Sequence, residues 1–288
     1  MSEQAIKKIL ITGANGFIGG SLMRYYQNHG QDTVGVDLIG NDDDIVQGDI
    51  SQPDTISQQL QECDVIIHTA ALVSNAMQDS DMWQVNVLAT RNLIQAAKEH
   101  KVRRFVQISS IVAYGNSAEG ELDETHPVHA DGGSYVLTKL ASEHVVLSEQ
   151  ANDDIEVVII RPGDAYGPGS RPWIIAPLEA IAKNQFMLPE KGEGFFRPIY
   201  IDDLVRGIAM ASRHPDAAGE IFNLSCEGYM FTKDYFTHHY RWLGKKRPMV
   251  VSTKLALKIS AIASKLADLL GNLNAVSYTH LTLPTSHN

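Results

Sequence analysis

Short apolar runs alternate along the chain with stretches of helical period. The runs are rich in Ile and Val and lie at residues 6–12, 33–37, 45–49, 65–69, 105–109, 157–161 and 221–224. Strands buried on both faces of a parallel sheet have such continuous apolar sequences. Apolar residues at helical spacing predict helices at residues 16–28, 54–62, 81–100, 134–150 and 202–213. This alternation predicts an α/β fold with a doubly wound parallel sheet.

The composition changes after Arg161. Six of the eleven prolines, at positions 162, 168, 172, 177, 189 and 198, lie in the next 38 residues and are interleaved with glycines. We expect this segment to be mostly irregular and to contribute to substrate binding, as long ordered loops on a rigid sheet often do. The chain then divides into a sheet domain at residues 1–161, completed by about 200–225, and a small interwoven C-terminal substrate lobe at 162–200 and 226–274.

The C-terminal part contains two unusual segments. Residues 252–270 are amphipathic, with three lysines among Leu and Ile, and predict a helix docked on the core or on a partner; a membrane-surface helix is the alternative. Residues 275–288 have no helical period and many Thr and Ser. They resemble a translated adapter sequence, so we expect a non-native tail and a missing natural C-terminus, and exclude them from the fold.

Charge and cysteine content narrow the functional class. With 34 acidic and 24 basic residues the net charge is −10, which disfavours nucleic acid as a partner. Two cysteines far apart, Cys63 and Cys226, give no disulfide framework. No apolar run reaches the roughly 18 residues of a membrane span, and the first residues show no signal-peptide pattern. We therefore expect a soluble cytoplasmic protein acting on a small molecule.

A glycine-rich turn follows the first predicted strand. Gly13, Gly16 and Gly19 have the spacing G-x-x-G-x-x-G, with a strand before them and a helix after them. Such glycines allow a tight turn, the approach of a pyrophosphate and close helix–strand packing in a Rossmann-type nucleotide-binding domain. Asp37 ends the next strand, where it can bind the adenine ribose hydroxyls. A carboxylate there repels the additional phosphate of NADP, so NAD is the predicted cofactor.

Three further residues form a candidate catalytic group. Tyr135 and Lys139 are four residues apart on a predicted helix and therefore share a face. A nearby ammonium favours a phenolate, so we expect Lys139 to lower the pKa of Tyr135 and to hold the nicotinamide ribose. Tyr135 is then the acid and base for a substrate hydroxyl. Ser110, at the end of the fifth strand, is predicted to orient the reacting oxygen, and its neighbour Ser109 should face the other way.

Together these motifs resemble an extended short-chain dehydrogenase/reductase of the NAD-dependent epimerase/dehydratase superfamily. The resemblance spans about residues 6–270 and also includes Tyr114-Gly115 and Arg161-Pro162-Gly163. It implies homodimerisation through the helices at 81–100 and 134–150. It implies cofactor contacts or support from residues in the glycine turn, at strand ends and on the following helix: Asn15, Phe17, Ile18, Asp49, Ile50, Ala70, Ala71, Asn86 and Pro162.

Three reactions occur on this scaffold. A dehydratase needs an acidic pair after the strand-five serine, but Ile111 and Val112 occupy those positions. Arg197 stands where related epimerases bind phosphate, whereas Asp164 replaces their usual Asn. The segment 161–168 and the C-terminal lysines look closest to the hydroxysteroid-dehydrogenase-like branch, and Phe186, Met187, Phe195 and Phe196 suit an apolar substrate.

We therefore predict an NAD-dependent oxidoreductase that interconverts a secondary alcohol and a ketone. Asp164 and Arg197 are the predicted substrate-binding residues. A nucleotide-sugar 4-epimerase with retained NAD and a non-catalytic dinucleotide-binding regulator are the alternatives. His126 and His129 lie in a polar loop that is more typical of a solvated surface, and we predict no metal site.

Overall fold

The computed structural model describes residues 6–40, 44–73, 78–115, 120–151, 154–256 and 258, and all statements below refer to these residues. Of the helix predicted at 252–270, residues 253–256 are helical, and most of the remainder lies outside the described residues. The predicted non-native tail at 275–288 also lies outside them. None of the described helices combines the length and apolar character that crossing a membrane requires.

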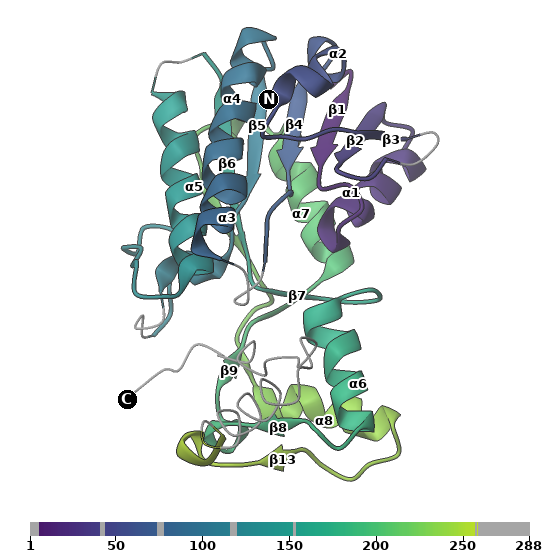
Figure 1. The fold of residues 1–288 in the computed structure, drawn as a ribbon, viewed down its shortest axis with the longest axis vertical. Coiled ribbons are helices and arrows are strands. Elements are labelled where there is room, and N and C mark those ends of the chain that lie inside the picture. The colour runs from purple at the N-terminus through teal and green to yellow at the C-terminus, as the bar shows by residue number, and fades with distance from the viewer. Residues whose placement is uncertain are drawn as a thin grey trace.

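A parallel sheet of seven strands forms the centre of the described chain, in the order β3-β2-β1-β4-β5-β6-β11 (Figure 1). This confirms the predicted α/β fold. The strands are β1 (Ile9–Thr12), β2 (Thr33–Asp37), β3 (Ile45–Gln47), β4 (Val65–His68), β5 (Arg104–Ile108), β6 (Glu156–Pro162) and β11 (Ile221–Leu224).

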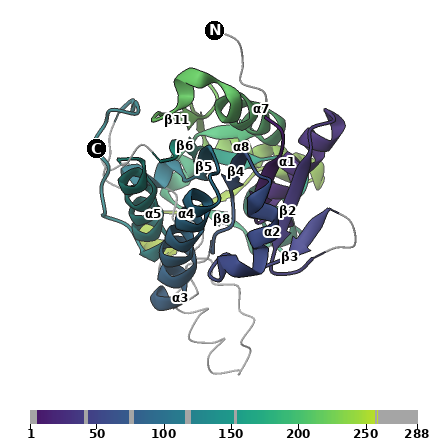
Figure 2. The same ribbon diagram turned by 90° about the horizontal axis from the view of Figure 1, so that it is seen from above.

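Helices cover both faces of this sheet (Figure 2). Along β1, Ile9 and Ile11 pack with α1 (Phe17–Asn28) and α7 (Ile201–Arg213), whereas Leu10 packs on the opposite side with α4 (Thr90–Glu99) and α5 (Ser134–Gln150). Because side chains alternate between faces and both faces are covered, every position of the strand is buried, and the first three are apolar. The short elements η1 (Pro53–Ile56) and α2 (Ser57–Gln61) extend the α4 side of the core.

The helix predicted at 81–100 is divided in the structure. It consists of α3 (Asp79–Trp83), a π-helical segment η2 (Gln84–Ala89) and α4. At the end of η2, the hydroxyl of Thr90, the first residue of α4, donates to the carbonyl of Asn86 at 2.9 Å. This side-chain bond competes with the regular backbone pattern, and such segments often mark functional positions.

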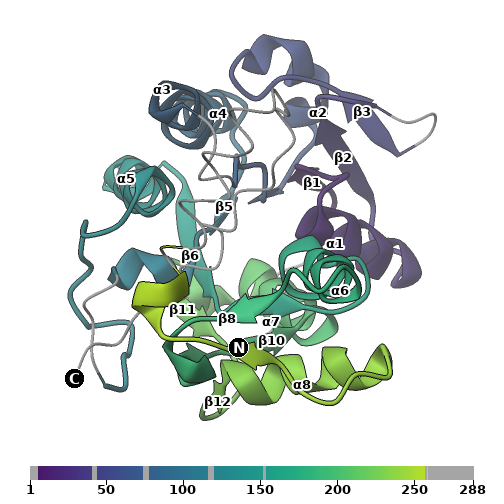
Figure 3. The same ribbon diagram turned by 60° about the horizontal axis from the view of Figure 1, so that its bottom comes forward.

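The lobe below the sheet has more regular structure than we predicted for residues 162–200 (Figure 3). Pro177 lies in the first turn of α6, where no backbone N–H is needed, so it does not prevent the helix. Aromatic and aliphatic residues from α6, β8, β9 and α8 form a separate core. The elements here are β7 (Asp164–Tyr166), η4 (Arg171–Ile175), α6 (Ala176–Ala182), β8 (Met187–Leu188), η5 (Glu190–Gly192), β9 (Phe195–Phe196), β10 (Pro198–Tyr200), β12 (Met230–Phe231), α8 (Thr232–Trp242) and β13 (Met249–Val250).

Two short 3-10 helices complete the described elements: η3 (Ile111–Tyr114) after β5, and η6 (Pro215–Ala217) after α7. The lobe segments are not contiguous in sequence, because the chain returns through β10 and α7 to add β11 to the sheet edge. The parallel pair β7 and β10 connects the sheet region with the lobe (Figure 1).

Candidate active site

A cleft of about 2510 Å³ lies at the carboxyl ends of the strands, between the sheet and the lobe. Residues that follow β1, β4 and β5 line one side of it, including Gly13, Ala70 and Ser110, and Trp173 and Phe186 of the lobe line the other. Open α/β sheets bind ligands at this edge. The volume exceeds the roughly 300–1,000 Å³ of a pocket for one drug-sized molecule, which suits a dinucleotide together with a substrate.

The glycine turn forms one end of the cleft. Gly13 has φ of +68°, a conformation that favours glycine, and a Cβ on Gly19 would stand 2.2 Å from the Gly13 carbonyl oxygen. The first turn of α1 has no acidic residue, and its N-cap, Gly16, offers no side-chain cap. The amide groups of this turn therefore remain available to an anion, and the geometry fits a pyrophosphate.

Asp37 lies beside this turn at the end of β2. One of its carboxylate oxygens accepts a hydrogen bond from the Asn15 amide at 3.0 Å, and the Asn15 side chain donates to the Ile39 carbonyl at 2.6 Å. Asp37, Asp49 and Ile50 all line the cleft. Their positions fit the adenosine half of a dinucleotide, with Asp37 as the acceptor for ribose hydroxyls.

Asn86 supports the cleft wall from behind. Its side chain accepts from the Leu72 amide at 2.7 Å and donates to the Leu72 carbonyl at 3.0 Å and to the Thr138 hydroxyl at 3.1 Å. Asn86 is buried and does not line the cleft. Asn86 therefore holds the loop that contains Ala70 and Ala71 against helix α5. It supports cofactor binding by positioning this loop.

Ser110, Tyr135 and Lys139 converge at the centre of the cleft. A side-chain hydrogen bond joins Ser110 to Tyr135, and both residues line the cleft. The Lys139 ammonium lies beneath them, 5.9 Å from the centroid of the Tyr135 ring, and donates to the Ile108 carbonyl at 3.0 Å. Lys139 has no other hydrogen-bond partner among the described residues, so two of its three N–H groups are left for a ligand.

The charge states differ from the sequence prediction. Burial raises the pKa of Tyr135 to about 12, partly offset by the bond from Ser110, whereas we predicted a lowered value. The Lys139 ammonium donates to the Ile108 carbonyl, and burial rather than this charge dominates the pKa of the phenol. Burial also lowers the pKa of Lys139 to about 8, against the opposing effect of the Glu143 charge. In this structure the phenol is protonated at neutral pH.

A buried ionic network lies behind the catalytic group. Glu143 on α5 accepts from Arg161 at 3.0 Å and 2.7 Å and from the Ser109 hydroxyl at 2.5 Å. Arg161 also donates to the Tyr114 hydroxyl at 3.0 Å, which in turn donates to Asn223 of β11 at 2.9 Å. Sequence reasoning missed Glu143, although its position one turn after Lys139 was a signal. Ser109 is thus used in this network, whereas Ser110 is joined to Tyr135.

His68, at the end of β4, has a structural role. Its two ring nitrogens lie 2.6 Å from the Thr12 hydroxyl and 2.9 Å from the Thr90 hydroxyl. Burial, aided by the charge of Lys139, lowers its pKa to about 3. The ring is therefore neutral and ties β1 and β4 to α4.

The lobe side of the cleft combines aromatic rings with cations. The Arg197 guanidinium donates to the Gly228 carbonyl at 2.9 Å and lies 5.3 Å from the centroid of the Tyr229 ring. Trp173, which sequence reasoning missed, lines the cleft together with Arg171 and Lys183. Of the four predicted apolar residues, Phe186 and Phe195 line the cleft, Phe196 belongs to the lobe core and Met187 does not line the cleft.

The structure brings most predicted site residues to this one cleft. Those that line it are Gly13, Gly16, Phe17, Ile18, Asp37, Asp49, Ile50, Ala70, Ala71, Ser110, Tyr135, Pro162, Asp164 and Arg197. Asn15, Gly19, Asn86 and Lys139 do not line it: Asn15 is exposed, and the other three are buried. In the described part of the chain, no three His, Cys, Asp or Glu side chains gather as metal ligands do.

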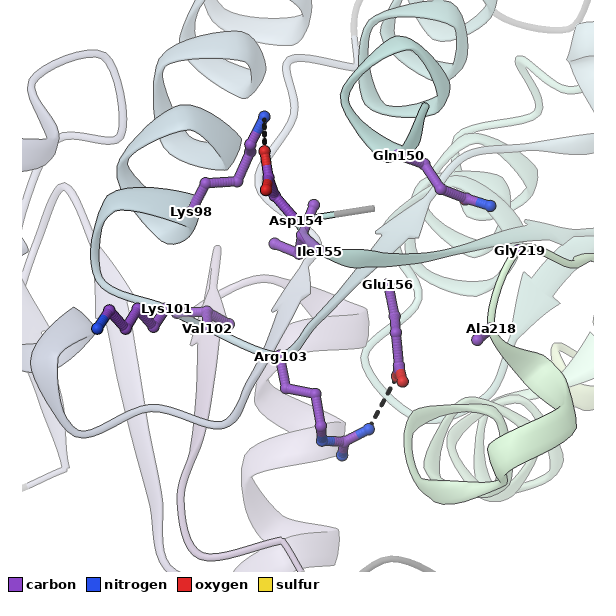
Figure 4. A pocket seen from close by; sticks show the side chains of 10 residues that line it. All are labelled: Lys98, Lys101, Val102, Arg103, Gln150, Asp154, Ile155, Glu156, Ala218 and Gly219. Atoms are coloured by element: carbon purple, nitrogen blue, oxygen red, sulfur yellow. Dashed lines mark hydrogen bonds and ion pairs between the residues drawn. The ribbon is translucent and has the colours of Figure 1, made fainter. Parts of the chain in front are cut away.

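A second pocket of about 730 Å³ lies at the opposite ends of the strands (Figure 4). Two of its three cations are already paired with acids: Lys98 with Asp154 at 3.4 Å and Arg103 with Glu156 at 2.9 Å. We do not assign it a function. Its lining residues are Lys98, Lys101, Val102, Arg103, Gln150, Asp154, Ile155, Glu156, Ala218 and Gly219.

Comparison with known proteins adds independent information. The NAD dependent epimerase/dehydratase family matches residues 9–225. UDP-glucose 4-epimerase of Vibrio cholerae is 30% identical over 236 residues, covering 76% of this chain and 70% of that protein. A 3 beta-hydroxysteroid dehydrogenase/Delta 5→4-isomerase of Mycobacterium tuberculosis is 28% identical over 225 residues, covering 72% and 60% respectively.

Solved structures agree with these matches. UDP-glucuronic acid 4-epimerase from Bacillus cereus, in complex with UDP-glucuronic acid and NAD, superposes with a TM-score of 0.75 and 26% identity over 85% of both chains. The resemblance drawn from the motifs is therefore confirmed, as is NAD as the cofactor of the matched family. The relatives include both dehydrogenases and epimerases.

Proposed function

This chain belongs to the NAD-dependent epimerase/dehydratase family, and from that premise we propose that it interconverts a secondary alcohol and a ketone. The observation that carries the proposal is the joined pair of Ser110 and Tyr135 in the cleft, with Lys139 beneath it and the glycine turn beside it. A dinucleotide-binding regulator has no need of this arrangement.

The residues present fit NAD. The amide groups at the start of α1 would hold the pyrophosphate, Asp37 the adenine ribose, and the free N–H groups of Lys139 the other ribose. When bound, NAD supplies the hydride acceptor or donor.

The chain's own residues handle the proton. In ketone reduction the neutral phenol of Tyr135 donates its proton to the substrate oxygen and becomes a phenolate. In alcohol oxidation the phenolate takes the proton of the substrate hydroxyl. Ser110 orients the same oxygen by a second hydrogen bond. An ammonium that turns from the Ile108 carbonyl toward the phenol lowers the pKa of Tyr135, which favours the oxidation direction.

A nucleotide-sugar 4-epimerase is the second candidate. Arg171, Lys183 and Arg197 line the substrate side of the cleft, and cations suit a diphosphate. Relatives in the same family act on UDP-sugars by name. Dehydration is less well supported, because Ile111 and Val112 line the cleft after Ser110 and neither side chain can transfer a proton.

One experiment tests the proposed chemistry. Secondary alcohols, 3β-hydroxysteroids and UDP-sugars are screened with NAD while the absorbance of NADH is recorded. Accumulation of NADH supports the dehydrogenase, and conversion of a UDP-sugar without accumulation supports the epimerase. Tyr135→Phe should lower turnover by about 10²–10⁴-fold, as loss of a general acid–base does, and leave NAD affinity unchanged.

A matched variant controls for the loss of a cleft phenol. Tyr229 also lines the cleft, so Tyr229→Phe should change turnover less than about twofold, within the ±0.5 kcal/mol typical of neutral surface changes. Full turnover in Tyr135→Phe would refute the assignment of the acid–base residue.

A further inference from the structure

Asp164 is a cleft residue whose carboxyl group has no cationic partner in the described part of the chain. It begins β7 and pairs with Pro198 of β10. One carboxyl oxygen, Oδ2, accepts from the Arg197 backbone amide at 3.0 Å. The Arg197 guanidinium does not reach Asp164, because it donates to the Gly228 carbonyl and lies over the Tyr229 ring.

The groups packed around Asp164 give it no counter-charge. Tyr166 stands on the same strand, and Tyr235 of α8 is close enough for the Asp164 charge to affect its pKa. A carboxylate at this position is therefore both desolvated and unpaired. The other titratable or charged groups near this strand pair are Tyr200, Cys226 and Asp203, the last an acid.

The protonated form of Asp164 has a defined hydrogen-bonding arrangement. Burial raises the pKa of Asp164 to about 7, so a large fraction of the molecules carries the acid proton at neutral pH. Since Oδ2 accepts the Arg197 amide hydrogen, the proton belongs on Oδ1. An O–H donor in a partly desolvated cleft is costly to leave without an acceptor. A substrate bound in the cleft can supply that acceptor.

We propose that Asp164 recognises the substrate as a neutral carboxylic acid, donating a hydrogen bond from Oδ1 to an uncharged hydroxyl or carbonyl oxygen of the substrate. This rests on the proposed function, since it assumes that the substrate enters this cleft. Above neutral pH the group becomes a carboxylate, which cannot donate and which repels an anionic group. The residue thus selects for an acceptor oxygen at this point of the substrate.

Binding at two pH values tests the recognition. UDP-glucose and a 3β-hydroxysteroid are titrated calorimetrically into the enzyme saturated with NADH. With a midpoint near 7, the competent fraction falls about tenfold between pH 6 and pH 8, so affinity of the wild type for the probe that binds should fall about tenfold. Asp164→Asn keeps an oxygen for the Arg197 amide and an N–H donor at every pH. Its affinity should not change over this range.

The protonation state of Asp164 can be measured separately from substrate binding. Infrared difference spectra of wild type minus Asp164→Asn, without substrate, should show a carboxylic acid carbonyl band at pH 6 that disappears with a midpoint near 7. The control Glu227→Gln removes an exposed acid from the same cleft and should keep the pH dependence of the wild type. Tyr135→Phe should bind with that same dependence, which separates this result from an error in the assigned chemistry.

The proposal is overturned by absence of the acid band at pH 6, by equal affinity of the wild type at both pH values, or by failure of both probes to bind. An affinity of Asp164→Asn that falls with pH as the wild type does also contradicts it, because the pH dependence then has another source.

Discussion

Removing the charge of Glu143 should lower the stability of the fold, because Glu143 forms a buried ion pair with Arg161. In Glu143→Gln one oxygen can still accept from Ser109 and from the Arg161 Nε. The new amide nitrogen, however, faces the Arg161 Nη2, which lies 2.7 Å from the oxygen it replaces, so two donors oppose each other. Both side chains are at most 3% exposed, and the guanidinium is left without its counter-charge.

Breaking one partner of a buried ion pair costs about 3–5 kcal/mol, a large part of a typical 5–15 kcal/mol folding free energy. We therefore expect thermal unfolding roughly 6–20 °C lower and a lower midpoint in urea. The matched control is Glu62→Gln. Glu62 pairs with Lys8 at 2.9 Å but is 70% exposed, and such a surface pair contributes about 1 kcal/mol or less.

A double-mutant cycle checks the cause. Glu143→Gln combined with Arg161→Met removes the unpaired cation, so the double variant should be more stable than the sum of the single changes predicts. Additive effects, or a Glu143→Gln variant as stable as Glu62→Gln, would show that the pair does not stabilise the fold in the way we describe.

Two further predictions concern the cofactor turn and acid stability. Gly19→Ala places a methyl group 2.2 Å from the Gly13 carbonyl oxygen, so NAD affinity measured by calorimetry should fall roughly tenfold or more. The control Gly133→Ala has open space around its added Cβ and should bind NAD normally. Equal NAD affinities of the two variants would contradict the close approach at Gly19. The pKa of His68 is about 3 in the fold, against 6.5 ordinarily, so the unfolded chain binds an extra proton as the pH falls. The free energy of unfolding should therefore decrease by roughly 1.4 kcal/mol for each pH unit below about pH 6.5. Asp164, with its raised pKa, acts in the opposite direction, and the test is therefore the difference between His68→Gln and wild type in urea unfolding from pH 6 to pH 4. A difference that stays constant with pH would show that His68 is not the buried neutral group.

The sequence predicted the elements whose pattern is local. The runs at 33–37 and 221–224 and the helix at 134–150 coincide with β2, β11 and α5, because each is set by its own apolar spacing and flanking polar residues. The helix predicted at 81–100 is present, but its middle is π-helical, which the apolar spacing did not predict. Asn86 in this segment bonds to a loop outside the helix. Proline counting overestimated irregular structure at 162–200, because Pro177 sits where a helix tolerates it.

For the site, spacing identified Ser110, Tyr135 and Lys139 but not their charge states. The pKa of Tyr135 is raised by burial, which depends on the whole fold, and the Lys139 ammonium donates to the Ile108 carbonyl, 31 residues away in sequence. The bond between Tyr114 and Asn223 spans 109 residues. Such contacts follow from packing, and no local pattern encodes them.

The late return of the chain to the sheet has a consequence for synthesis on the ribosome. β6 ends at Pro162 and its outer neighbour β11 begins at Ile221, with the lobe segment and α7 translated in between. At about 5–20 residues per second, the nascent protein carries β6 as an open edge for roughly 3–12 seconds. An unpaired apolar strand edge is a template for association with other chains. Chaperone binding during this interval is therefore expected at β6, before the last strand emerges from the exit tunnel.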